Sequence, residues 1–218
     1  MQEKTPVLIG GFGRLGQGYT NSLFMVNSTG ELMGKYDKSK LVPLGEYVPF
    51  ENILGKFIQR LSPLKSHLIA GSNEQFVDSP FGRMILGICY ESAYPEIFRK
   101  QTRAGGEYIV TASNDAHYKA AMPAQHQGQD VMRAIENDRW AVRITNTGYS
   151  SIINPRGETK WRSALNQYTI HRENIYRQNS QTLYVRLGDW LTIFFLSLAG
   201  VSWLNLFNPK NKTEQKDR

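Results

Sequence analysis

Short hydrophobic runs separated by polar turns follow one another along the first 180 or so residues and predict a mixed α/β domain. A polar turn at 27–30 separates two apolar runs and predicts a hairpin, and a second strand pair leads into a turn at 154–157. The predicted strands are, in chain order, 21–26, 31–36, 84–88, 108–112, 140–144 and 150–153, and the predicted helices are 95–103 and 125–138.

Apolar residues also recur at helical spacing between Phe50 and Leu61, with charged residues on the opposite face. This pattern predicts an amphipathic helix. The helix either docks on the core of the domain or lies on a membrane surface, and the sequence leaves both interpretations open.

An uncharged apolar segment of eighteen residues runs from Trp190 to Phe207. At a rise of ~1.5 Å per residue a helix of this length spans about 27 Å, which is enough for a bilayer core. Because a buried helix of a soluble protein usually keeps a polar face, we favour a transmembrane helix over a core helix. The predicted organisation is an α/β domain at 1–183, the transmembrane helix with its lead-in at 184–208, and a basic cytoplasmic tail at 209–218.

The start of the chain does not resemble a signal peptide, because its apolar run at 7–9 is too short. A single C-terminal span with a cytoplasmic tail needs the preceding domain outside, so either the orientation is reversed or upstream membrane segments are missing, and we favour missing segments. The glycines of 11–16 match a dinucleotide-binding fingerprint, but that motif requires a following helix, and strands are predicted instead. We interpret this match as accidental.

The amino-acid composition argues against disulfide, metal-binding and nucleic-acid-binding functions. The chain has 218 residues, a single cysteine and a formal net charge of +7. One cysteine excludes an intrachain disulfide and a cysteine-based zinc cluster, and the four histidines lack metal-binding spacing, so no metal and no cofactor are expected. The basic residues are scattered, without the aromatic-interleaved stripe of nucleic-acid binders, so no nucleic-acid partner is expected.

The single cysteine, Cys89, follows the buried strand at 84–88 and precedes polar residues. A lone cysteine is most often a small buried apolar residue. A strand end, however, fixes a sulfur in position and exposes it beside backbone N–H groups, which suits a nucleophile. Cys89 is therefore a candidate nucleophile.

Several further motifs stand in chain order in the segments 36–49, 87–96, 114–116, 125–126, 133–137, 145–148 and 186–190. Together they resemble the nitrilase superfamily of carbon-nitrogen hydrolases, and more narrowly its integral-membrane apolipoprotein N-acyltransferases, and the resemblance places 1–183 in the C-terminal portion of a carbon-nitrogen hydrolase domain. The resemblance covers nearly the whole chain, although 117–119 departs from the aromatic and glycine residues that usually follow the loop at 114–116.

The resemblance implies a nitrilase-like αββα sandwich, incomplete at its N-terminus, and a Glu–Lys–Cys triad. By motif position the lysine is Lys38 and the nucleophile is Cys89, while Glu46 matches a second glutamate of the segment 36–47 that carries Lys38, called the lysine loop below. Tyr90 and Glu91 follow the nucleophile and are expected in the oxyanion and substrate pocket. The general-base glutamate has no counterpart in this chain, so we expect a C-terminal fragment or a split subunit with little activity alone.

The resemblance further implies ping-pong acyl transfer through a thioester, from a phospholipid to the N-terminal amine of a lipidated apolipoprotein. The expected location is the bacterial inner membrane, with the catalytic domain periplasmic, and a separate N-terminal half is a further expected partner. Two alternatives stay open: a membrane-tethered amidase or carbamoyl hydrolase of the same superfamily, and a catalytically inactive remnant or partner subunit.

Overall fold

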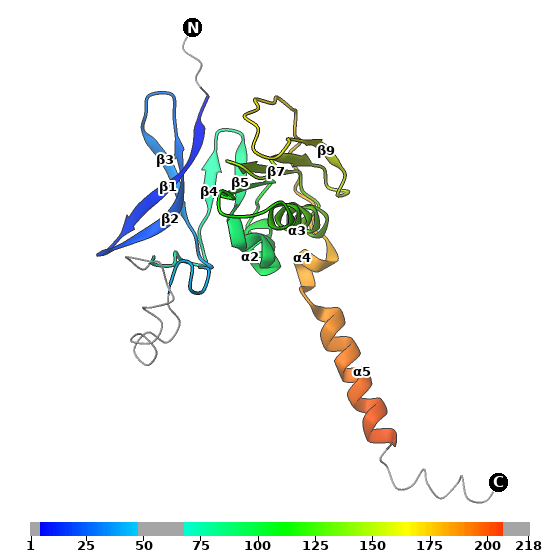
Figure 1. Cartoon of the computed structure of the whole chain (residues 1–218). Helices are drawn as coiled ribbons and strands as arrows, with labels where there is room; N and C mark the ends of the chain where they lie inside the picture. The colour runs from blue at the N-terminus through cyan, green and yellow to red at the C-terminus, as the bar shows by residue number, and fades with distance from the viewer. Residues whose placement is uncertain (1–4, 48–67, 207–218) are drawn as a thin grey trace, which may run out of the picture.

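The chain folds into two β-sheets and a layer of helices (Figure 1). The computed structural model describes residues 5–47 and 68–206. The first sheet is antiparallel and consists of β1 (Val7–Leu15), β2 (Gly18–Val26) and β3 (Leu32–Asp37) in that order. Its hairpin between β2 and β3 confirms the one predicted from the apolar runs around 27–30.

The second sheet has six strands in sequence order, β4 to β9, and a parallel centre. Strands β5, β6 and β7 run parallel, because a helix crosses back between each pair, while the outer strands pair antiparallel. The strands are β4 (Val77–Ser79), β5 (Gly82–Ile88), β6 (Tyr108–Ser113), β7 (Ala141–Thr145), β8 (Ser151–Ile153) and β9 (Thr159–Arg162).

The helices are α2 (Pro95–Arg103), α3 (Ala121–Asn137), α4 (Leu183–Leu187) and α5 (Trp190–Leu206), with a 3₁₀ turn, η1, at Cys89–Ala93. Helix α2 matches its predicted bounds, and α3 begins four residues before the predicted start. Helix α4 docks on α2 through Val185, which is fully buried and accepts a hydrogen bond from Arg99 at 3.2 Å.

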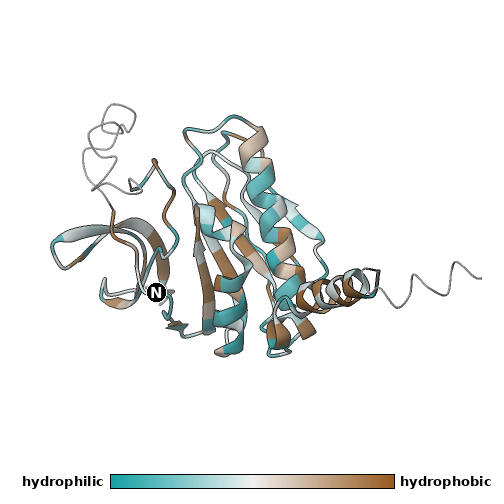
Figure 2. Ribbon diagram, turned by 90° about the horizontal axis from the view of Figure 1, so that it is seen from below, coloured by the Kyte–Doolittle hydropathy of each residue, from teal (hydrophilic) through white to brown (hydrophobic). Residues whose placement is uncertain are grey.

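Two hydrophobic cores hold three layers together (Figure 2). The first lies between the sheets, where Leu23 and Tyr36 of the small sheet pack with Leu86 and Val110 of the large one. The second lies between the large sheet and the helices, where Ile85 and Ile109 pack with Phe98 and Ala134. Alternate residues of β5 therefore serve opposite cores, as the period-two geometry of a strand requires.

The structure confirms that the match of residues 11–16 to a dinucleotide-binding fingerprint is accidental. These residues lie in β1 and its turn, and strand β2 follows where the fingerprint requires a helix. The sequence pattern did not predict strand β1 or the short strands β4 and β9. The amphipathic helix predicted between Phe50 and Leu61 lies outside the described residues.

Helix α5 extends from the domain with apolar side chains on all sides, and its described side chains are exposed (Figure 1). The predicted helix is thus present over 190–206. Among the described residues, however, no helix combines the length and apolar character that a membrane crossing needs. The predicted transmembrane helix is therefore not confirmed.

Phe98 of α2 supports the strand that carries Cys89. Its ring is fully buried, and a Cβ atom added at Gly87 would lie 2.6 Å from Phe98 Cζ, so helix and strand pack with no room for a side chain at 87. We expect Phe98→Ala to lower the free energy of unfolding by about 3–5 kcal/mol, measured by denaturant titration. Tyr168→Ala, at a position 89% exposed, is the control and is expected to change it little. A loss below about 1 kcal/mol for Phe98→Ala would contradict this packing.

Candidate active site

The polar residues of interest gather where the parallel strands end. Cys89 follows β5, Asp115 follows β6 and Asn146 follows β7, so parallel strands bring their carboxyl ends to one edge of the sheet. This edge is where open α/β sheets generally bind ligands. Asn146 ties two of these loops together, because its side chain accepts from the backbone N–H of Asp115 at 2.9 Å and donates to Asn114 at 2.8 Å.

Cys89 is half-buried and has a backbone φ of +53°. A left-handed conformation at a residue with a side chain is uncommon and strained, and such strain often marks functional sites. Here it turns the chain sharply from β5 into η1, so the thiol stands at the strand end as the sequence pattern indicated.

Lys38 and Glu46, both predicted site residues, form an ion pair between a buried lysine and a half-buried glutamate. Lys38 is 1% exposed, and its Nζ lies 2.9 and 2.8 Å from the two carboxylate oxygens of Glu46. The same carboxylate accepts from the backbone N–H of Val42 at 2.8 Å and from Asn21 at 3.2 Å. An ammonium held by both oxygens of one carboxylate has little freedom, so its charge is fixed in place.

Glu91 is fully buried and joins the lysine loop to the turn that follows Cys89. One carboxylate oxygen accepts from the backbone N–H groups of Ser39 and Lys40, at 2.7 and 3.2 Å, and from the Ser39 hydroxyl at 2.8 Å. The other accepts from the Tyr36 hydroxyl at 3.0 Å and the Ile88 N–H at 2.8 Å. Burial raises the pKa of Glu91, and these hydrogen bonds offset only part of that effect.

Tyr90, also predicted in the pocket, is half-buried and contacts Tyr94 edge-to-face, with ring centroids 5.1 Å apart. The backbone of Tyr90 directly follows the cysteine. The geometry thus gathers Lys38, Glu46, Tyr90 and Glu91 around the loop and turn at Cys89.

A histidine of α3 and an aspartate from the loop after β6 lie near the cysteine. A side-chain donor atom of each of Cys89, Asp115 and His126 lies within 4.8 Å of the other two. His126 Nδ1 is 3.3 Å from Asp115 Oδ1, which also accepts from the Ser113 hydroxyl at 2.6 Å. Burial opposes ionisation of Asp115, but hydrogen bonds from His126 and Ser113, together with the charge of Arg143, lower its pKa.

Tyr118 lies beside His126. Its ring meets that of His126 edge-to-face, with centroids 5.8 Å apart. Burial raises the pKa of the Tyr118 hydroxyl, and the negative charges of Cys89, Asp115 and Glu46 raise it further. Tyr118 thus contacts His126 and interacts electrostatically with Cys89, Asp115 and Glu46.

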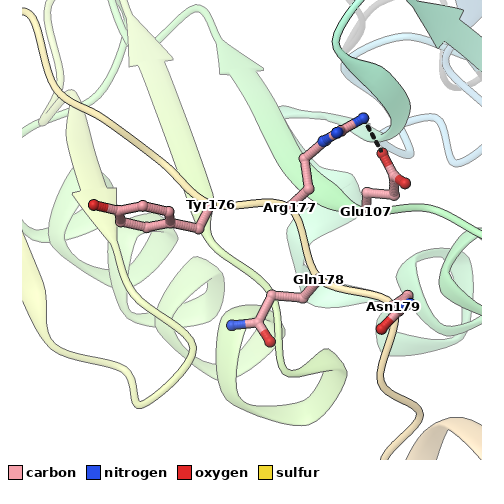
Figure 3. A pocket seen from close by; sticks show the side chains of 5 residues that line it. All are labelled: Glu107, Tyr176, Arg177, Gln178 and Asn179. Carbon is pink, nitrogen blue, oxygen red and sulfur yellow. Dashed lines mark ion pairs between the residues drawn. The ribbon is translucent and has the colours of Figure 1, made fainter.

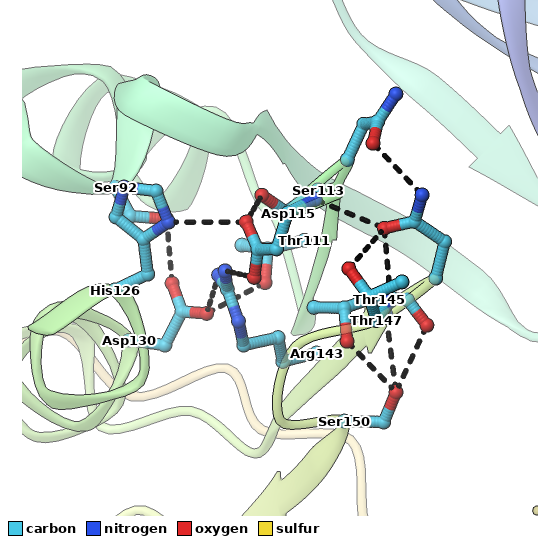
Figure 4. A network of polar contacts seen from close by, with 12 residues as sticks. Ser92, Thr111, Ser113, Asp115, His126, Asp130, Arg143, Thr145, Thr147 and Ser150 are labelled. Atoms are coloured by element: carbon cyan, nitrogen blue, oxygen red, sulfur yellow. Dashed lines mark hydrogen bonds and ion pairs between the residues drawn. The ribbon is translucent and has the colours of Figure 1, made fainter. Parts of the chain in front are cut away.

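A buried charge network supports the histidine side (Figure 4). Arg143, which is 1% exposed, bridges two carboxylates, with Nη1 2.8 Å from Asp130 and Nη2 3.3 Å from Asp115. Asp130 also accepts from Ser92 at 2.6 Å and Thr111 at 2.8 Å. The network thus connects α3 and the parallel strands to η1, the turn that begins at Cys89.

The donor set of Cys89, His126 and Asp115 contains the atom types that bind zinc. Each oxygen of Asp115 is already used, one by Ser113 and His126 and the other by Arg143. A guanidinium 3.3 Å from that carboxylate also opposes a second cation there. The described contacts therefore favour a hydrogen-bonded network at this position.

A separate surface hollow lies away from this edge (Figure 3). It is lined by Glu107, which immediately precedes β6, and by residues 176–179, and Arg177 pairs with Glu107 at 3.6 Å. Because Glu107 stands at the opposite end of β6 from Ser113, this hollow is distinct from the site at Cys89.

Comparison with known proteins agrees with this architecture. The model of the carbon-nitrogen hydrolase family matches residues 1–177. The chain belongs to the carbon-nitrogen hydrolase family. Relatives named apolipoprotein N-acyltransferase are 60% identical over 200 residues in Nostoc sp. and 53% identical over 204 residues in Synechocystis sp.. These matches cover 91% and 94% of this chain but 40% and 39% of the relatives, so the chain spans about two fifths of their length.

Solved structures show the same carbon-nitrogen hydrolase fold. An amidase of the nitrilase superfamily from Nesterenkonia superimposes with a TM-score of 0.55 at 17% identity, covering 74% of this chain and 58% of that one. The NitFhit protein of C. elegans gives a TM-score of 0.59 at 20% identity, covering 75% and 40%. At these identities the likeness concerns the fold, and the predicted nitrilase-like α/β class is confirmed.

Sequence reasoning gave no role to the buried polar face of α3. His126, Asp130, Arg133 and Asn137 recur at helical spacing, and all four are buried. Such a stripe normally faces solvent. Its signal was available in the sequence: the polar stripe coincides with polar residues at the end of the buried strand at 108–113, a combination that indicates an internal hydrogen-bond network.

The Glu91 contacts predict a large effect for a small change. In Glu91→Gln an amide N–H₂ replaces one carboxylate oxygen and faces N–H and O–H donors, so hydrogen bonds to a charged, buried acceptor are lost. We expect the free energy of unfolding to fall by about 3 kcal/mol, measured by denaturant titration near neutral pH.

Glu74→Gln makes the same chemical change at an exposed position and serves as the matched control. Equal stabilities of the two variants would show that the Glu91 contacts do not join the loop to the turn.

Proposed function

We propose that this chain carries the acyl-accepting thiol of an N-acyltransferase of lipoprotein maturation. The observation that carries the proposal is Cys89, in a strained left-handed conformation at a strand end beside a lysine loop that Glu91 fixes to its turn. Membership of the carbon-nitrogen hydrolase family and similarity to relatives named apolipoprotein N-acyltransferase support it.

In the proposed reaction the Cys89 thiolate attacks an acyl ester of a phospholipid. The S–C bond forms, the ester C–O bond breaks, and the lysophospholipid leaves with a proton. The acyl group then passes to the N-terminal amine of a lipidated apolipoprotein. A thiol with an ordinary pKa of about 8.5 is mostly protonated at neutral pH, and a nearby ammonium favours the thiolate.

The proposed roles follow from charge and position. Lys38 supplies the fixed positive charge, and Glu46 holds it. The ammonium and the backbone N–H of Tyr90 are proposed to bind the oxyanion, an interaction worth roughly 3 kcal/mol for each donor. Glu91 orients the lysine loop through its five hydrogen bonds. The role of general base for thioester formation belongs, in this proposal, to a glutamate outside residues 1–218.

The proposed substrates are both lipids or lipid-anchored: a phospholipid acyl donor and a lipidated apolipoprotein acceptor. The proposed location is therefore the bacterial inner membrane. Helix α5 supports a membrane role, because exposed Ile193, Phe195, Leu196 and Leu204 present apolar surface around its circumference. Apolar surface of this extent is costly in water and favours contact with lipid.

The acyl-enzyme test uses a chimera in which this chain replaces the matching part of the Nostoc relative. Incubation with acyl-labelled phospholipid is expected to give a hydroxylamine-sensitive label on Cys89, identified by mass spectrometry, and the label then moves to a diacylated lipopeptide. Cys89→Ser is expected to abolish the thioester. Lys38→Met is expected to slow its formation by roughly 100-fold or more, because the fixed positive charge is lost.

Lys100→Met removes an exposed lysine and is the matched control, with an unchanged rate expected. Labelling by small amides but not by phospholipid, with water as the acceptor, would support the amidase alternative and contradict the proposal. A chimera that forms no acyl-Cys89 from either donor would support the inactive alternative.

The membrane proposal predicts that charge on α5 weakens lipid binding. The chain with Phe195→Asp and Leu196→Asp is expected to lose flotation with phospholipid vesicles, because aspartate is costly in a hydrocarbon environment. Ile170→Asp, at a position 83% exposed but outside α5, is the control and is expected to float like the unaltered chain. Equal flotation of all three proteins would contradict a role of α5 at the membrane.

A further inference from the structure

We infer that His126, oriented by Asp115, is a second acid–base residue that removes the proton from the attacking amine when the acyl group leaves Cys89. The inference rests on the proposed function, since it concerns the acceptor half of that reaction. The proposed roles of Lys38 and Glu46 do not involve the buried pair of His126 and Asp115, and the inference gives that pair a role.

The geometry places an imidazole next to the reacting sulfur. Donor atoms of Cys89, Asp115 and His126 lie within 4.8 Å of one another, and Asp115 engages the imidazole through Nδ1 at 3.3 Å. In the part of the chain that the structure describes, Asp115 is the imidazole's hydrogen-bonding partner, which leaves Nε2 for another. The thioester carbon is one bond from the sulfur, so an amine that attacks it approaches the neighbourhood of the imidazole, where a general base must come within hydrogen-bond reach of the proton or act through one water.

The surroundings hold the imidazole in this orientation. His126 is 4% exposed and lies on α3, one turn before Asp130 on the same helix. Asp115 is fixed in turn by Ser113 and by Arg143, and a Cβ atom added at Gly148 would lie 2.1 Å from Asp115 Oδ2. A residue at 148 with any side chain would displace the aspartate, so the close approach requires glycine.

The charge count of the network suits a group that gains a proton. Two carboxylates, Asp115 and Asp130, contact one guanidinium, that of Arg143, so a proton on the imidazole makes the set of four side chains neutral. The other titratable groups around the imidazole are Cys89 and Tyr118, and the latter meets its ring edge-to-face. An imidazolium formed during transfer would thus have an acceptor for its Nδ1 proton already in place.

The acceptor step needs such a base. The neutral amine attacks the thioester carbon, the N–C bond forms and the C–S bond breaks with the electron pair returning to sulfur. The nitrogen must then lose one proton to become an amide. His126 takes that proton and passes it to the Cys89 thiolate or to water, which returns both residues to their starting states.

A purely structural role for His126 predicts a different outcome, so the test separates the two half-reactions. Cys89 of the chimera is loaded with p-nitrophenyl octanoate, which does not depend on the natural donor, and the octanoyl thioester is then mixed with an amine-bearing diacylated lipopeptide. For His126→Gln we expect thioester formation within about threefold of the unaltered protein. Transfer to the amine is expected to fall by roughly 100-fold or more, the usual contribution of a general base.

Three further readouts identify proton transfer. The part of the transfer rate's pH dependence that the imidazole contributes should disappear in His126→Gln, and added imidazole should restore part of the rate. Asp115→Asn, which removes the positioning carboxylate, should lower transfer more than loading. His171→Gln is the matched control, because His171 stacks on Trp161 with ring centroids 4.1 Å apart, away from Cys89 in the sequence and in its contacts.

Equal losses in loading and transfer, or an unchanged transfer rate and pH profile in His126→Gln, would overturn the inference. These results are distinguishable from a failure of the proposed function. If the unaltered chimera takes no acyl group from phospholipid, the proposed donor is wrong, while the loaded thioester still reports on His126.

Discussion

The carboxylate of Glu91 is the constraint on which the site depends. It is fully buried, and it accepts five hydrogen bonds from residues at the end of β3, in the lysine loop and at the end of β5. Those two strands belong to different sheets. A single charged group therefore fixes the separation of Lys38 from the turn at Cys89, and it does so with backbone donors whose positions do not depend on rotamers.

Such a device is costly, because burying a carboxylate is opposed by desolvation, and that same burial raises the pKa of Glu91. A hydrophobic residue of similar volume would fill the space, but it would leave the N–H groups of Ser39, Lys40 and Ile88 without acceptors. The cost of three unpaired buried donors exceeds the gain from removing the charge. The hydrogen bonds of Glu91 thus offset part of the desolvation of its carboxylate and fix the geometry between the two sheets.

The sequence predicted those parts of the fold that depend on local pattern. The hairpin around 27–30, helix α2 and the parallel strands follow from runs of two- and 3.6-residue periodicity, and Cys89 stands at its strand end as the pattern indicated. Strands β4 and β9 are three and four residues long, too short for a period to emerge. The contacts of His126 escaped prediction for another reason, since they join a helix to two strand ends that are distant in the sequence.

The 3₁₀ turn η1 connects the two hydrogen-bond networks of the site. In a 3₁₀ turn consecutive side chains point about 120° apart, so neighbouring residues can reach different partners. Glu91 reaches the lysine loop, while the Ser92 hydroxyl donates to Asp130 at 2.6 Å and the Ser92 carbonyl accepts from Arg133 of α3 at 2.6 Å.

Both supporting networks therefore attach to the turn that Cys89 begins. The lysine–glutamate pair is anchored through Glu91, and the histidine–aspartate pair through Asp130 and Ser92. A displacement of either network must move η1, and with it the strained backbone of Cys89. A ping-pong reaction of the proposed kind needs proton transfer in two separate steps at one sulfur. Two independently anchored pairs that share a single turn meet that need without requiring the thiol to move between them.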